Sequence, residues 1–150
     1  MSVSNTKIDV KKTVVDELHK PARKNFKRRK TIIRGINETF QADLIDVSNL
    51  ARYNNRHRYI LLVIDVFSKF IWAVSVKTKS GKDVTDAIKR ILKPPNIPNN
   101  IQTDMGTEFY NKHFRELMEK LNINHYSTFS STKAAIAERA IRTIKSWLKY

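Results

Sequence analysis

The chain of 150 residues is long enough for one compact domain, and its hydrophobic content of 41% is ordinary for a protein with a packed core. It contains no cysteine, which excludes disulfide bonds, thiol nucleophiles and cysteine-ligated zinc, so any metal must be held by oxygen or histidine ligands. The 29 Lys and Arg residues exceed the 14 Asp and Glu residues and give a formal charge of +15, which favours a polyanionic partner, above all nucleic acid.

The segment 1–36 is predicted to be a basic arm ahead of the folded domain. It lacks the apolar core of a signal peptide, and no later segment approaches the roughly 20 apolar residues of a membrane span, so we expect an intracellular protein without a membrane partner. A short helix over Val10–His19 would end at Pro21, and disorder away from DNA is the alternative. The arm should contact phosphates without reading sequence, or act as a nuclear import signal in a eukaryotic cell. Its basic side chains are Lys20, Arg23, Lys24, Lys27, Arg28, Arg29 and Lys30.

From residue 37 to residue 150 the pattern becomes that of a folded domain. The runs Phe40–Val47, Arg58–Phe67 and Phe70–Lys77 are rich in β-branched and aromatic residues and predict a meander of three strands. Ser80 can cap a helix that extends to about Lys93. The apolar residues of this helix fall on one stripe, which consists of Val84, Ile88, Ile91 and Leu92.

The second half of the domain alternates strands and helices. Ile101–Asp104 and Ile123–Thr128 are predicted strands, and a helix between them has Phe114, Leu117, Met118 and Leu121 on one face. A final helix should begin near Ser131 or Thr132 and bury Ile136, Ala140, Ile144 and either Trp147 or Leu148. This order predicts an α/β domain, a five-stranded mixed sheet flanked by helices, as in the ribonuclease H-like fold. Because the chain ends inside its last helix, we expect the C-terminal helices of such a domain to be truncated.

Three acidic residues are candidates for one site. Asp43 lies within an apolar strand, where a divalent cation would offset the cost of burying its charge. Asp104 ends a strand, at the carboxyl edge where open α/β sheets keep their sites. Glu138 lies on the final helix about 200° from Ile136, so we expect it opposite the apolar stripe and able to point at the strands.

Each acid also has an ordinary structural alternative. Asp43 could accept a hydrogen bond at a strand end, Asp104 could cap a helix, and Glu138 could pair with Arg142 one helical turn later. Three other acids, Asp46, Asp65 and Glu108, are expected to have structural roles or to support the residues of the site from behind. The histidines lack close metal-ligand spacing, so packing or surface roles are expected for His19, His57, His113 and His125.

Four motifs, in this order, resemble the catalytic core of retroviral-type integrases. They are Gln-Ala-Asp-Leu-Ile-Asp at 41–46, Leu-Leu-Val-Ile-Asp-Val-Phe-Ser-Lys at 61–69, Gln-Thr-Asp-Met-Gly-Thr-Glu-Phe at 102–109 and Ala-Glu-Arg-Ala-Ile-Arg-Thr-Ile-Lys at 137–145. The segment Glu-Leu-His-Lys-Pro-Ala-Arg-Lys-Asn-Phe-Lys-Arg-Arg-Lys at 17–30 is similar to integrases of Polinton (Maverick) transposons and their viral relatives. The interval from Asp104 to Glu138 is slightly shorter than in the retroviral enzymes.

The resemblance implies an Asp, Asp, Glu triad of Asp43, Asp104 and Glu138 that holds Mg²⁺ or Mn²⁺, two ions in all, without an organic cofactor. The implied reactions are 3′-end processing and strand transfer, both of them phosphodiester transesterifications on DNA. The implied partners are element ends, a target duplex and further copies of the chain assembled on DNA. Basic residues of the final helix would hold phosphates beside the metals, or else form a solvated face. These residues are Arg139, Arg142, Lys145 and Lys149.

The sequence also departs from the family pattern. After the glutamate the family commonly has Arg, an aromatic residue, Asn and Arg; here Arg139 and Arg142 match, and Ala140 and Ile141 replace the middle pair. Neither the zinc-binding domain that precedes the retroviral core nor the DNA-binding domain that follows it is expected within these residues. Two alternatives stay open: a catalytically decayed or fragmentary DNA-binding protein, and a ribonuclease H-like nuclease acting on RNA–DNA hybrids or junctions.

Overall fold

The computed structural model describes residues 32–127 and 135–147, which belong to one compact unit, Ile32–Tyr150. No helix in these two stretches is long and apolar enough to cross a membrane. In chain order the elements are β1 (Thr39–Asp46), the 3-10 helix η1 (Ser48–Leu50), β2 (Tyr59–Asp65), β3 (Ile71–Val76), α2 (Gly81–Ile91), β4 (Asn100–Thr103), α3 (Lys112–Lys120), β5 (Asn124–Ser127) and α4 (Ala135–Trp147).

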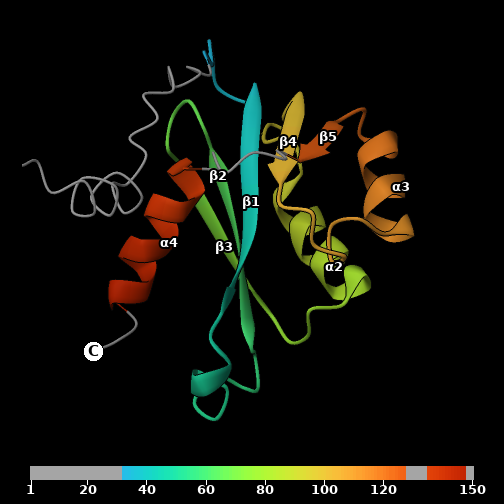
Figure 1. Cartoon of the computed structure of the whole chain (residues 1–150). Helices are drawn as coiled ribbons and strands as arrows, with labels where there is room; N and C mark the ends of the chain where they lie inside the picture. Colours follow the sequence, from blue (N-terminus) through green and yellow to red (C-terminus); the bar gives the residue numbers. More distant parts are fainter. Residues whose placement is uncertain (1–31, 128–134, 148–150) are drawn as a thin grey trace, which may run out of the picture. The chain divides into compact units, whose positions relative to one another are not determined.

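The five strands form one mixed sheet in the order β3-β2-β1-β4-β5 (Figure 1). β1, β2 and β3 pair in antiparallel fashion, and β4 and β5 continue the sheet parallel to β1. The predicted meander and the predicted five-stranded mixed sheet are therefore confirmed. β4 ends at Thr103, one residue after the Gln41–Gln102 pair, whereas β1 continues to Asp46, so the carboxyl end of β4 lies beside the middle of β1.

The helices cover both faces of the sheet. On one face, α2 and α3 pack over the main apolar core, which includes Phe40 and Ala42 of β1. On the other face, α4 packs over a smaller apolar cluster that includes Ile45 and Val47 of the same strand (Figure 1). Because side chains alternate along a strand, the odd-numbered residues of β1, Asp43 among them, face α4.

Local signals account for the ends of two helices. The Ser80 hydroxyl accepts a hydrogen bond of 3.1 Å from the Asp83 N–H, which confirms the predicted cap of α2. Asn111 caps α3 by accepting 3.0 Å from the Phe114 N–H, a cap that the sequence analysis did not assign. The basic arm, the helix expected over Val10–His19 and the expected caps of the final helix lie outside the described residues, and the boundary after residue 36 stays a prediction.

The buried face of α4 contains two residues of the predicted stripe, Ala140 and Ile144, which pack on the smaller apolar cluster of the sheet. Ile136 is half-buried, and Trp147 is 71% exposed. Ala137, which is 1% exposed, and Ile141 also face the sheet, although the stripe did not include them. A hydrogen bond from the Ala137 N–H to Gln41 anchors this side of the helix to β1. The alternative, Leu148, lies outside the described residues.

Candidate active site

Two glutamines join the strands that carry the candidate aspartates. Gln41 and Gln102 are partners in the parallel β1–β4 pairing, both are 8% exposed, and Gln41 Nε2 donates a hydrogen bond of 2.9 Å to Gln102 Oε1. Asp43 and Asp104 each follow by two positions. Because side chains alternate along a strand, Asp43 lies on the face of β1 that α4 covers, and Asp104, in the turn after β4, lies near enough for its charge to act on the Asp43 carboxyl.

Asp43 is half-buried, and its Oδ1 accepts a hydrogen bond of 2.7 Å from the Leu44 N–H. Burial raises the pKa of the Asp43 carboxyl, and the negative charges of Asp104 and Glu108 raise it further, against the lowering effect of the Leu44 bond. Three acidic side chains therefore act on one another at this edge of the sheet.

Asp104 lies in the turn that follows β4, where its Oδ1 accepts a hydrogen bond of 3.1 Å from the Gly106 N–H. The neighbouring Thr103 hydroxyl donates to the Asp104 carbonyl oxygen at 2.7 Å and accepts from His125 Nε2 at 2.9 Å. Burial lowers the pKa of His125, so the ring is neutral near neutral pH and carries its proton on Nε2 in this arrangement. The turn of Asp104 is thus supported from β5.

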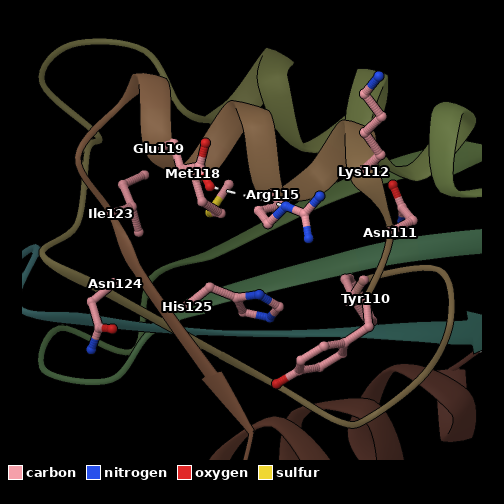
Figure 2. A pocket seen from close by; sticks show the side chains of 10 residues that line it. Tyr110, Asn111, Lys112, Arg115, Met118, Glu119, Ile123, Asn124 and His125 are labelled. Atoms are coloured by element: carbon pink, nitrogen blue, oxygen red, sulfur yellow. Dashed lines mark ion pairs between the residues drawn. The ribbon is translucent and has the colours of Figure 1, made fainter.

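A cavity of about 580 Å³ lies beside this turn, between the start of α3 and β5 (Figure 2). His125 points into it from β5, and Tyr110 faces it from the loop before α3, with the two ring centroids 4.8 Å apart. The His125 ring also packs on Phe114, with a centroid distance of 4.9 Å. His125 therefore forms a wall of the cavity and supports Thr103, which fits the packing role expected for it.

Glu138 lies in the first turn of α4 and is half-buried. The preceding residue, Ala137, donates its N–H to Gln41 Oε1 at 3.1 Å, so the Gln41 side chain links β1, β4 and α4. Within residues 32–127 and 135–147, however, no three acidic or histidine side chains meet closely enough to hold a metal ion. The structure places the helix of Glu138 against the strand of Asp43 without joining all three carboxylates in a closed cluster.

The donor set nevertheless fits a hard divalent cation. Burial, with the nearby charges of Asp104 and Glu108, raises the pKa of the half-buried Asp43 carboxyl. Carboxylate oxygens are the ligands that Mg²⁺ and Mn²⁺ prefer, and a cation at Asp43 and Asp104 would offset the cost of burying the Asp43 charge and the repulsion between the two carboxylates.

The basic residues of α4 fall into two groups. Lys145, two helical turns after Glu138, lies near enough for its positive charge to act on the Asp43 and Asp46 carboxyls. Arg139 and Arg142 are exposed on the same helix. Lys149 and the basic residues of the arm lie outside the described residues, and the assignment of all these side chains to DNA stays a prediction.

The remaining acids and histidines have structural contacts. Asp65 is fully buried and accepts hydrogen bonds from the Phe67 N–H and the Ser68 hydroxyl, which closes the β2–β3 turn. Asp46 accepts from the Ser48 N–H at 2.9 Å. His57 Nδ1 lies 2.9 Å from the Asn54 carbonyl oxygen, His113 is exposed, and Glu108 is ion-paired with Lys79.

Gln41 and Gln102 were not predicted from the sequence as parts of the site. A signal was present, because the pattern Gln-x-Asp occurs twice, before Asp43 and before Asp104. Lys79 was not predicted either, and its ion pair with Glu108 joins two distant loops. No local pattern identifies that pair, since an isolated lysine before a helix is ordinary surface composition.

Comparisons with known proteins place this geometry in a family. The family model described as "Integrase core domain" matches residues 36–133. A transposon-derived protein of Caenorhabditis elegans, named as putative and uncharacterized, is 36% identical over 103 residues, which cover 68% of this chain and 36% of that protein. The Gag-Pro-Pol polyprotein of squirrel monkey retrovirus is 27% identical over 106 residues, 69% of this chain and 6% of the polyprotein. The chain thus spans about a third of the first relative and a small part of the second.

Solved structures show the same fold. The HTLV-2 integrase catalytic core domain, in complex with magnesium, matches with a TM-score of 0.62 at 21% identity. The match covers 75% of this chain and 70% of the HTLV-2 chain. A chain from the simian T-cell lymphotropic virus intasome, in complex with the PP2A regulatory subunit B56 gamma, matches with a TM-score of 0.67 at 22% identity. The match covers 79% of this chain and 43% of the intasome chain. The expected ribonuclease H-like fold is confirmed.

Proposed function

The chain belongs to the integrase core domain family, and we propose that it is the catalytic domain of a DNA integrase, which performs metal-dependent 3′-end processing and strand transfer. The observation that carries this proposal is the Gln41–Gln102 hydrogen bond, because it joins β1, which contains Asp43, to β4, which leads directly to Asp104. An ordinary surface carboxylate needs no such placement.

Asp43 and Asp104 are the residues that would hold the metal, with Glu138 of α4 as the third ligand. The chemistry that a pair of Mg²⁺ or Mn²⁺ ions supplies, when bound, is activation of the attacking oxygen and stabilisation of the leaving oxygen in an in-line displacement. The protein orients these ligands: Gln41 fixes both strands, and its bond to Ala137 fixes the turn of helix that carries Glu138.

The basic side chains of α4 would position DNA. Lys145 lies near Asp43, and Arg139 and Arg142 are exposed on the same helix, so all three can contact phosphates next to the reacting bond. The formal charge of +15 supports a polyanionic substrate, with the arm of residues 1–36 adding contacts that do not depend on sequence. The proposed partners are element ends and a target duplex.

The comparisons support an oligomer as the active form and an origin in a mobile genetic element or virus. The HTLV-2 core is described in dimeric and trimeric forms, and the simian viral chain belongs to an intasome. We therefore propose that copies of this chain assemble on DNA, inside the cell and in the nucleus of a eukaryotic host. The resemblance of the segment 17–30 supports an element of the Polinton type.

The test uses the purified chain with supercoiled plasmid and labelled duplex DNA, in Mg²⁺, Mn²⁺ or chelator. Nicked or joined products should require metal and should be lost in Asp43→Asn and Asp104→Asn. Asp46→Asn is the matched control, because Asp46 is an exposed acid of the same strand. Metal-independent nicking, or full activity in Asp104→Asn, would contradict the proposal.

A second candidate is a DNA-binding protein without turnover, favoured by the lack of a closed three-carboxylate cluster among the described side chains. It predicts salt-sensitive DNA binding with no product at any metal concentration. A ribonuclease H-like nuclease would share the metal chemistry, and it would prefer RNA–DNA hybrids or junctions when these are compared with duplex DNA.

A further inference from the structure

We propose that Lys79 is a DNA-phosphate contact at the edge of the Asp43–Asp104 site, and that the buried Glu108 carboxylate holds its ammonium there. The inference rests on the proposed function, because it assigns a further residue to the same DNA-binding site.

The ion pair has one buried and one exposed partner. Lys79 Nζ lies 2.9 Å from Glu108 Oε1, and the side chains are 52% and 4% exposed, respectively. A buried carboxylate without a partner is costly, so Glu108 stabilises the position of the ammonium as well as being neutralised by it. The exposed half of Lys79 remains open to solvent and to a ligand.

The position of Glu108 is fixed by its surroundings. Its carboxylate lies over Gly106, where an added Cβ would stand 2.5 Å from the carboxyl group. Its carbonyl oxygen accepts a hydrogen bond of 2.8 Å from Asn111 Nδ2, the side chain that also caps α3. Glu108 is therefore a fixed anchor between the turn of Asp104 and helix α3, and the lysine that it binds cannot swing freely.

The pair lies beside the turn of Asp104. The Glu108 carboxylate lies over Gly106, whose N–H donates a hydrogen bond of 3.1 Å to Asp104 Oδ1. The charges agree with this placement, because Glu108 acts on the Asp43 carboxyl and Asp104 acts on the Lys79 ammonium. A phosphodiester bound at Asp43 and Asp104 would therefore lie near this ammonium. The lysines of residues 1–36 and of α4 are not assigned such a buried carboxylate partner, and they would contact DNA less specifically.

The chemistry of the ammonium suits a phosphate. An ammonium has three N–H donors, and in the described part of the chain Glu108 is the one acceptor to which Lys79 is joined. The other donors can bind phosphate oxygens while Glu108 keeps its bond. Because Lys79 and Glu108 together carry no net charge, this arrangement adds a phosphate donor without adding positive charge that would repel a divalent cation from Asp43 and Asp104.

The first experiment measures DNA binding as a function of salt by fluorescence anisotropy, without metal, for the full chain. Lys79→Gln should weaken binding several-fold and lower the slope of log K against log salt by about one, as expected for the loss of one phosphate contact. Lys79→Arg should retain most of the binding. Lys82→Gln is the matched control, an exposed lysine of α2 that should leave the slope nearly unchanged. Equal slopes for Lys79→Gln and Lys82→Gln would overturn the proposal.

The second experiment separates a contact from a merely structural role. In the double variant Lys79→Gln/Glu108→Gln the buried position is again neutral, and the two amides can bond as Gln41 and Gln102 do. If Lys79 binds phosphate, DNA binding by the double variant should stay weak, although the midpoint of its thermal unfolding recovers. If Lys79 serves only to neutralise Glu108, the double variant should recover wild-type DNA binding, which would refute the phosphate contact.

The single variant Glu108→Gln tests the anchor. It keeps an acceptor for Lys79 and leaves the ammonium uncompensated, so DNA binding should be retained while the Mg²⁺ concentration needed for half-maximal turnover should rise several-fold. An unchanged Mg²⁺ requirement would refute the charge argument. If the wild type makes no product at all, the proposed reaction fails, and the metal-free binding slopes still decide the role of Lys79.

Discussion

The Gln41 side chain donates a hydrogen bond of 2.9 Å to the Gln102 side chain from the neighbouring parallel strand. The oxygen of the same amide accepts the Ala137 N–H at 3.1 Å. One buried amide therefore fixes the strand of Asp43, the strand that leads to Asp104 and the helix turn that carries Glu138. In the proposed reaction Gln41 is a positioning residue. Its amide contacts none of the reacting atoms, and it sets the spacing of the elements whose carboxylates would hold the metal.

The first prediction concerns this amide. Gln41→Met keeps the volume of the side chain and removes both hydrogen bonds, which leaves the Ala137 N–H buried without a partner. We expect a loss of about 1–3 kcal/mol in the free energy of unfolding, measured by urea titration, and a larger fractional loss of metal-dependent product. Asn49→Ala, at an exposed position of η1, is the control. Wild-type turnover in Gln41→Met would show that the amide has no part in placing the carboxylates.

The second prediction follows from the raised pKa of Asp43. A carboxyl whose pKa is raised in the folded state binds more protons there than in the unfolded state, so its contribution to stability falls as the pH rises above the ordinary value of 3.8. Asp43→Asn should therefore raise the melting temperature at pH 7, and the gain should shrink towards pH 4. A variant less stable than wild type at pH 7 would contradict the burial cost assigned to this charge.

The third prediction concerns metal binding without turnover. A cation that binds only the folded protein raises its melting temperature according to mass action. We expect Mg²⁺ or Mn²⁺ to stabilise the wild type and to have little effect on Asp43→Asn or Asp104→Asn. Asp46→Asn should respond like the wild type, and an equal shift in all four proteins would indicate binding elsewhere.

The fourth prediction concerns His125, whose pKa is lowered by burial. The unfolded chain takes up a proton on this ring near its ordinary value of 6.5, before the folded chain does, so stability is present above that pH and is lost as the pH falls below it. His125→Gln keeps a donor for Thr103 and should flatten the unfolding free energy between pH 7 and pH 5. A slope as steep as that of the wild type would assign the acid sensitivity to other groups.

The fifth prediction concerns the packing of α4. Ile141 packs on the apolar cluster of Ile45, Val47 and Leu62, whereas Trp147 is 71% exposed. Ile141→Ala should cost roughly 1–2 kcal/mol in the free energy of unfolding, since the side chain is half-buried. Trp147→Ala should change it by less than about 0.5 kcal/mol, measured in the same titration. The reverse order would contradict this placement of the two side chains.

Patterns that act over short distances predicted much of this fold. The β-branched runs marked the meander, the stripe from Val84 to Leu92 marked α2, and Ser80 marked its first turn. Asp43 and Asp104 could be predicted to lie near each other because strand alternation and the rule for carboxyl ends are local as well. These elements agree between sequence and structure because each is specified by residues within one or two turns or strands.

The remaining features depend on contacts between residues far apart in the chain. The inward position of Ala137 depends on its bond to Gln41, and a helix with apolar residues on several sides does not show from its sequence which additional residues are buried. The pairing of Lys79 with Glu108 depends on how two loops meet. Hydrophobic periodicity predicts neither feature, because it describes residues within one helix or strand and not their contacts with distant residues.

The two apolar clusters on the opposite faces of the sheet differ in size. Asp43 and Asp104 are attached to the sheet and the main core, whereas Glu138 is attached to a helix that rests on the smaller cluster. Local opening costs least where the fewest apolar contacts must be broken. We therefore expect the helix that carries Glu138 to separate from the sheet at a lower cost in free energy than β1 and β4 separate from each other.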